Sequence, residues 1–274
     1  MSNAPPLIIT VAPNGARKTR ADHPALPITP DELAEEAAQC LATGAAMIHL
    51  HVRDEEGKHS LDVERYKAAI AAIRRRVGDD LIVQVTSEAV GVYSAEQQMA
   101  MVRELRPEAV SLAIRELCPE AGSEEAAATF FAWLETVDTA PQYILYSPAD
   151  VARFEALRER GVIPGECPFV LYVLGRYGGD ADASVEQLPL MIAAGKRDVI
   201  WSACAFGATE ERCMESALTL GGHCRVGFEN NLQLSSGDIA PNNAALVTQL
   251  VECAMSQGRR VATPAEVRNL LAMA

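Results

Sequence analysis

The chain lacks the features of membrane, secreted and nucleic-acid-binding proteins. No apolar run approaches the roughly 20 residues of a membrane helix, and the first residues lack a signal peptide's basic and apolar regions. The seven cysteines show no C-x-x-C spacing, which indicates buried or free thiols rather than a disulfide framework. Lys and Arg number 24 against 37 Asp and Glu, and a net charge of −13 argues against binding nucleic-acid phosphates. We therefore expect a cytoplasmic protein with no membrane or nucleic-acid partner.

The chain also has no low-complexity tract and no recognisable linker, so we expect residues 1–274 to form a single domain. Apolar, β-rich runs alternate eight times with amphipathic helical patterns. The predicted strands are 7–12, 46–52, 81–87, 109–114, 142–147, 168–174, 198–205 and 224–229. The predicted helices are 30–43, 61–77, 94–105, 123–137, 148–160, 184–194, 208–220 and 242–256, with one more short helix from Thr263 onward.

Eight β-α units in a chain of this length predict a (β/α)8 TIM barrel, since that fold takes about 250 residues. A doubly wound open sheet is the alternative. It should carry a Gly-rich phosphate turn after its first strand, and Pro13-Asn14-Gly15-Ala16 is not such a turn. Local signals mark the helix ends: Thr29, Ser94 and Ser147 are predicted N-caps, and Gly44 and Gly78 are predicted to end the first two helices.

Two histidines, His49 and His51, lie two residues apart in the apolar segment 45–54. Because successive side chains of a strand point to opposite faces, both imidazoles share one face. Neutral imidazole is a good zinc ligand, so the spacing favours a metal site, with a pair of hydrogen-bonded core histidines as the alternative. The other histidines, His23, His59 and His223, are interpreted as surface or structural residues.

Polar residues also alternate toward the carboxyl ends of three predicted strands, where the chemistry of a TIM barrel gathers. The sets are Gln84, Thr86 and Glu88; Ser111, Ala113 and Arg115; and Arg225, Gly227 and Glu229. Glu229 is the natural third ligand, because strands 46–52 and 224–229 would both flank strand 7–12. Gly227 is expected to leave space between Arg225 and Glu229. Two histidines and a glutamate with one open position are typical of catalytic zinc.

Four segments resemble the zinc-dependent β-keto acid cleavage enzymes: 9–16, 48–53, 84–91 and 221–231. The resemblance implies a TIM barrel whose zinc is held by His49, His51 and Glu229. It also implies a reaction in which a β-keto acid and acetyl-CoA give acetoacetate and a new acyl-CoA, through a zinc-stabilised enolate and a reverse Claisen step. Arg225 would hold a carboxylate or belong to a charged dyad, and Thr86 would help orient the substrate.

The chain departs from the family pattern at two positions. Asn230 stands where a family member uses an aspartate in proton transfer, and an amide cannot accept that proton. The base must then be another group, and Glu88 or a metal-bound hydroxide is the candidate. Arg17 stands where that member has a glutamate facing a substrate amine, which predicts a preference for neutral or carboxylate-bearing β-keto acids. Alternatively, Arg17 turns outward to pair with an acid such as Asp22 or Asp54.

Further substrate contacts are expected from Asn14, Arg17, Ser87, Arg115 and Glu116, and a homo-oligomer is expected. Two other classes of function stay open. Zinc amidohydrolases also use a His-x-His motif, but on the first strand and with further histidines from later strands. A non-catalytic barrel that binds a metal or an acyl ligand is the other alternative.

Overall fold

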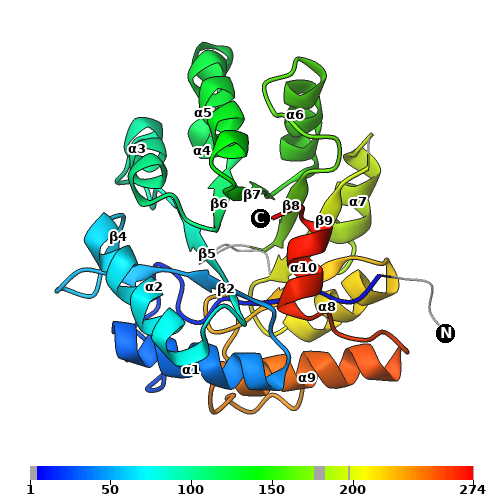
Figure 1. The fold of residues 1–274 in the computed structure, drawn as a ribbon. Coiled ribbons are helices and arrows are strands. Elements are labelled where there is room, and N and C mark those ends of the chain that lie inside the picture. The colour runs from blue at the N-terminus through cyan, green and yellow to red at the C-terminus, as the bar shows by residue number, and fades with distance from the viewer. Residues whose placement is uncertain (1–4, 176–182, 197, 274) are drawn as a thin grey trace.

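In the computed structural model, which describes residues 5–175, 183–196 and 198–273, eight parallel strands close into a barrel surrounded by helices (Figure 1). Around the barrel the order is β1–β10–β9–β8–β7–β6–β5–β2, and β2 pairs back with β1. The strands are β1 (Ile9–Val11), β2 (Met47–Leu50), β5 (Ile82–Thr86), β6 (Ala109–Ala113), β7 (Ala140–Leu145), β8 (Phe169–Leu174), β9 (Ile200–Ala205) and β10 (His223–Val226). The predicted TIM barrel is confirmed, and the open sheet is excluded.

The helices that follow these strands are local structures with their own start and stop signals. They are α1 (Pro30–Thr43), α2 (Val63–Val77), α3 (Ala95–Leu105), α5 (Glu124–Thr136), α6 (Pro148–Glu159), α7 (Gln187–Ala194), α8 (Glu210–Thr219) and α9 (Asn243–Ser256). Thr29 and Ser94 form capping boxes, and the Ser147 hydroxyl caps α6. Gly44 and Gly78 end α1 and α2. The predicted caps are therefore confirmed. Within the described residues, no helix has the length and apolar character needed to cross a membrane.

Most of the predicted strands are shorter than expected, and two of these changes affect the site. The strand predicted over 109–114 ends at Ala113, and the short helix α4 (Ile114–Leu117) follows, so Arg115 lies on a helix rather than on a strand face. The strand predicted over 224–229 ends at Val226. Gly227 has a φ of 136°, and a Cβ there would lie 2.4 Å from the Ala12 carbonyl oxygen. Gly227 thus allows a turn against β1 and does not continue the strand.

Small elements that the periodicity did not predict complete the chain. A two-stranded antiparallel hairpin, β3 (Val52–Arg53) with β4 (His59–Ser60), follows β2, and a 3-10 turn, η1 (Ala121–Ser123), precedes α5. Strand β2 itself stops at Leu50, so His51 sits between β2 and β3.

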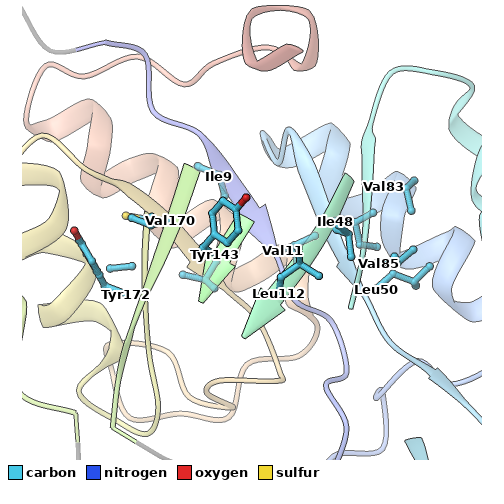
Figure 2. Close-up of a cluster of buried hydrophobic side chains, with 14 of the residues drawn as sticks. Ile9, Val11, Ile48, Leu50, Val83, Val85, Leu112, Tyr143, Val170 and Tyr172 are labelled. Carbon is cyan, nitrogen blue, oxygen red and sulfur yellow. The ribbon is translucent and has the colours of Figure 1, made fainter. Parts of the chain in front are cut away.

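Alternate residues of the strands separate two cores. One set points outward and packs under the helices; Figure 2 labels ten of its members, Ile9, Val11, Ile48, Leu50, Val83, Val85, Leu112, Tyr143, Val170 and Tyr172. The other set points into the barrel, and at its amino-terminal end it consists of Ile8, Met47, Ile82, Ala109 and Phe169. These residues pack with Ala262 and with Val267 of α10 (Pro264–Leu270), which crosses this end of the barrel in Figure 1. The short helix predicted from Thr263 onward is therefore confirmed, and it packs on this end of the barrel.

Candidate metal centre and active site

The three predicted metal ligands meet at the carboxyl-terminal end of the barrel. His49 lies on β2, His51 follows it, and Glu229 lies in the turn after β10. Because β1 pairs with both β2 and β10, these positions are brought to the same side of the barrel. The two Nε2 atoms are 3.1 Å apart, and Glu229 Oε2 lies 3.5 Å from that of His49 and 3.4 Å from that of His51. All three residues are buried.

A chain of side-chain hydrogen bonds across the barrel sets the protonation of His49. Gln142 on β7 donates an amide hydrogen to Ser202 Oγ (2.9 Å), and Gln84 on β5 donates one to Gln142 Oε1 (3.1 Å). The amide oxygen of Gln84 faces His49 Nδ1 at 2.8 Å. Because an amide oxygen only accepts, Nδ1 must carry the proton. His49 Nε2 is therefore an unprotonated nitrogen that points at the cluster.

The donor set fits a divalent cation. Burial lowers the pKa of His49 to about 4 and that of His51 to about 3, so both imidazoles are neutral near pH 7. Burial by itself would raise the pKa of Glu229, but Arg225, His49 and His51 together outweigh it and hold the pKa well below its usual range. Glu229 Oε2 is buried without a hydrogen-bond partner in the described part of the chain. Acceptor atoms thus converge where a cation would relieve them, and two imidazoles plus one carboxylate suit zinc.

Arg225 gives the two oxygens of the Glu229 carboxylate different partners. Its Nη2 donates to Glu229 Oε1 at 3.1 Å and also lies 3.3 Å from Cys204 Sγ. Oε1 is therefore engaged by the guanidinium, while Oε2 is left for the histidine side. Arg225 also lines the cavity above the cluster, where its charge faces whatever enters.

A cavity of about 220 Å³ lies over the cluster, and both His49 and Glu229 contribute to its floor. Charged groups gather in its wall: Arg17, Glu88, Arg115, Glu116 and Arg225. Apolar side chains, among them Ile144, Val173 and Phe206, form the rest of the lining. A small pocket with converging charges and an apolar wall is suited to an anionic substrate of a few carbon atoms.

Two carboxylates in the cavity wall differ in their partners. Glu88 lies 4.0 Å from His51 Nδ1, and burial, with Glu229 and Glu116 nearby, raises its pKa to about 7. Glu116 accepts a hydrogen bond from the Ala89 backbone N–H at 3.0 Å, and burial raises its pKa as well. A bound cation would oppose the rise at Glu88. Of the two, Glu88 is the carboxylate next to the histidines.

The loop after β1 carries Arg17 on the exposed rim of the cavity. The Arg53 side chain holds this loop by donating to the carbonyl oxygens of Gly15 (3.1 Å) and Lys18 (2.9 Å). Lys18 Nζ in turn donates to the Glu229 carbonyl oxygen at 2.7 Å. The segment that presents Arg17 is therefore tied to the turn that presents the ligand carboxylate.

The outward partners considered for Arg17 are engaged locally. Asp22 accepts hydrogen bonds from the backbone N–H and the hydroxyl of Thr19, and Asp54 accepts from the backbone of its own hairpin turn. Arg115, the second cation expected near the substrate, pairs with Asp150 at 2.5 Å and lies over the Tyr146 ring at 4.0 Å. Its charge is largely compensated.

Four further predicted site residues lie in different surroundings. Thr86 lines the cavity, and its Oγ1 accepts from the Glu88 N–H. Ser87 faces α3, where its Oγ contacts Gln98 and the Ser111 carbonyl oxygen. Asn14 Nδ2 donates to the carbonyl oxygens of Pro27 and His51. Asn230 is buried, and neither atom of its amide has a partner among the described residues.

Ser87, Asn14 and Asn230 are not among the described residues that line the cavity. For Ser87 the reason is strand parity, because Thr86 and Glu88 point inward. We keep Thr86 in the proposed site and assign Asn14 and Ser87 to its support.

The interpretation of His59 as a surface or structural residue is wrong in its first part. His59 is buried, with Nδ1 3.3 Å from His51 Nδ1 and Nε2 3.0 Å from the Glu88 carbonyl oxygen. The signal in the sequence was the short turn with Gly57 between two alternating runs, which predicts a hairpin that folds back on His51. His23 and His223 are also buried, and each forms a backbone hydrogen bond.

Glu210 is a further buried acid that the sequence pattern did not single out. It begins α8 and accepts a hydrogen bond from Asn231 Nδ2 at 3.1 Å. Burial raises its pKa to about 8. It holds the turn that carries Glu229 from the helix side.

A closed (β/α)8 barrel with a His-His-Glu cluster beneath a charged cavity defines a TIM-barrel enzyme with a candidate divalent-metal centre. The model of the beta-keto acid cleavage enzyme family matches residues 6–273. The chain therefore belongs to the beta-keto acid cleavage enzyme family.

Several relatives match along nearly their whole length. The 3-keto-5-aminohexanoate cleavage enzyme of Fusobacterium nucleatum is 32% identical over 275 residues, covering 97% of this chain and 98% of the relative. The 3-oxoadipate:acetyl-CoA acetyltransferase of Cupriavidus necator is 29% identical, covering 98% and 95%. Among solved structures, the apo structure of ObcA matches with a TM-score of 0.72 at 20% identity, covering 91% of this chain and 66% of that one. This structural likeness concerns the fold alone.

Proposed function

We propose that the protein condenses a β-keto acid with acetyl-CoA and releases acetoacetate and a new acyl-CoA. The observation that carries the proposal is the convergence of His49, His51 and Glu229 on the floor of a charged cavity. The names of the relatives support it, since one is a β-keto acid cleavage enzyme and another an acetyl-CoA acetyltransferase. Zinc is the metal that we assign to the three ligands.

Zinc held by His49, His51 and Glu229 would polarise the substrate's keto oxygen and stabilise the negative charge that develops when the α-carbon loses a proton. The other roles fall to the cavity wall. Arg225 binds the substrate carboxylate, because its guanidinium faces the cavity and is oriented by Glu229. The Thr86 hydroxyl orients the substrate beside it.

Glu88 takes the proton from the α-carbon, because it is the cavity carboxylate next to the histidines and is not one of the three ligands. The α-carbon then bonds to the acetyl carbon as the CoA thiolate leaves. The thiolate attacks the original keto carbon, and the bond between that carbon and the α-carbon breaks. Glu88 returns its proton to the α-carbon, so that acetoacetate and the new acyl-CoA are the only products.

The charge at the rim of the cavity determines which acyl group of the β-keto acid is preferred. Arg17 is exposed at the rim of the cavity, and Arg115, which also lines the cavity, pairs with Asp150. A cation at this position repels an amino-bearing β-keto acid and favours a neutral or carboxylate-bearing one. A homo-oligomer and a cytoplasmic location stay predictions.

The test uses zinc-loaded protein and a panel of β-keto acids, each with and without acetyl-CoA, with products identified by mass spectrometry. We expect acetoacetate and a new acyl-CoA only when both substrates are present. Turnover without acetyl-CoA would point to a hydrolase, and binding without turnover would point to a regulatory barrel. Either result would overturn the proposal.

A further inference from the structure

The hairpin after β2 places a third imidazole behind the metal centre. In its ladder Arg53 pairs with His59, which puts the His59 ring against that of His51, with centroids 5.0 Å apart at 60°. The other side of the His59 ring lies at the carbonyl of Glu88, just beyond β5. His59 is buried, and it is not among the described residues that line the cavity. Its contacts are with a ligand and with the backbone.

These contacts allow one arrangement of protons when His59 is neutral. A carbonyl oxygen only accepts, so His59 Nε2, 3.0 Å from the Glu88 oxygen, must carry the proton. His59 Nδ1 is then an acceptor. It faces His51 Nδ1 at 3.3 Å, so His51 must carry its proton on Nδ1. The Nε2 atom of His51, which faces Glu229, is left with a lone pair.

His49 is supported in the same way by a different group. Its Nδ1 faces the amide oxygen of Gln84 at 2.8 Å, so each histidine has one acceptor behind it. Both supports lead to the same strand, because Gln84 lies on β5 and the carbonyl of Glu88 follows that strand. Ligating histidines in general rely on such an acceptor to fix the ring and its tautomer.

We propose that His59 is a positioning residue, which accepts the Nδ1 proton of His51 and so keeps the Nε2 lone pair of His51 directed at the metal centre. The inference rests on the metal centre assigned under the proposed function. Loss of such a partner weakens metal affinity by about 10–100-fold. His59→Leu should show this loss. His59→Asn should bind zinc much more tightly than His59→Leu, because its Oδ1 replaces the Nδ1 acceptor.

The test measures zinc affinity by competition with a chromophoric chelator in wild type, H59L and H59N. His223→Leu is the matched control. His223 is equally buried and accepts a hydrogen bond from the Ile8 N–H at 3.0 Å, but it opens β10 at the other end of the barrel. We expect H223L to lose stability and keep the wild-type zinc affinity. Equal zinc affinity in H59L and wild type would overturn the proposal, as would an H59N that binds as weakly as H59L.

A second measurement reads the protons directly and needs no substrate. Imidazole ¹⁵N NMR of the zinc-loaded wild type should show His59 with its proton on Nε2 and His51 with its proton on Nδ1. A proton on His59 Nδ1 would overturn the proposal, because that nitrogen could then not accept the Nδ1 proton of His51. Failure of the β-keto acid assay would leave these results intact, whereas a wild type that binds no zinc would overturn both the metal centre and the role of His59.

Discussion

At the amino-terminal end of the barrel, Met47 and Ile82 point inward and pack under Val267 of α10. Two residues farther along the same strands, the inward positions are His49 and Gln84, which are joined by a hydrogen bond. The inward face of β2 and of β5 therefore changes from apolar to polar over two residues, which is one period of a strand. The same strands carry a well-packed core at one end and a site at the other.

The two ends of the barrel also differ in how their buried polar atoms affect folding stability. Buried side-chain atoms without a partner in the described chain include Thr10 Oγ1, Ser111 Oγ and Glu229 Oε2, all in the polar part of the barrel. Each such atom opposes folding by its lost solvation. The packed amino-terminal end and the helix layer offset this, so the carboxyl-terminal end can hold groups that only a ligand satisfies.

The largest expected effect is at the ligands themselves. His49→Ala or Glu229→Ala should lose both the metal and the activity, because either change removes one of three ligands. Metal analysis by mass spectrometry and turnover of a β-keto acid check this. A chelator should lower the melting temperature of wild type but not that of the variants, since only a folded protein that binds metal is stabilised by it. Full metal occupancy in His49→Ala would refute the assignment.

The next effect concerns proton transfer. Glu88→Gln should lower kcat by about 10²–10⁴-fold, the usual contribution of a general base. Glu116→Gln is the matched control, because that carboxylate shares the cavity but is engaged by the Ala89 N–H. We expect a much smaller loss there. Near-normal turnover in Glu88→Gln would make Glu88 a substrate contact only.

The packed end should respond to a cavity mutation in stability rather than in metal binding. Ile82→Ala removes a fully buried side chain two residues before Gln84 on β5 and should cost about 2–5 kcal/mol of unfolding free energy. Urea denaturation of the metal-free protein gives this value, and zinc competition gives the affinity. A zinc affinity that falls as far as in His59→Leu would show that the two ends are coupled.

Acid should destabilise the amino-terminal end through His223. Burial, with Arg259 nearby, lowers its pKa to about 3, below the unfolded value of about 6.5. Between these values the unfolded chain binds more protons, so stability falls as the pH drops from 6.5 toward 3, by up to a few kcal/mol. His223→Asn keeps an acceptor for the Ile8 N–H and cannot titrate, so its metal-free stability should fall less over this range. Parallel pH curves for the two proteins would contradict this.

The smallest effect is expected at Arg17. Because Arg17 is exposed, its discrimination between amino-bearing and neutral β-keto acids is screened to about 1 kcal/mol, roughly fivefold in kcat/KM. Arg17→Glu should shift the preference toward the amine. Arg20→Glu, in the same loop but paired with Glu32, is the control and should not. A wild type that prefers the amine would reverse the assignment of the substrate.

Local features were predictable from the sequence because they depend on near neighbours. Strand and helix periodicity, the Thr29 and Ser94 caps and the shared face of His49 and His51 each involve a few consecutive residues. Eight such units fit few folds, so the barrel followed from them. Strand adjacency in a closed barrel then brought Glu229 to the histidines, even though the residue proved to lie in a turn.

Only the tertiary structure determined the final positions of the polar side chains around the site. Gly227 turns the chain where the Ala12 carbonyl lies against it, and this contact joins residues that are far apart in the sequence. His59 reaches His51 only through the hairpin, and Arg115 meets Asp150 because a helix replaces the expected strand end. Periodicity says which face a residue occupies while a strand lasts. It cannot say where packing between distant segments ends that strand, and the site lies just past those ends.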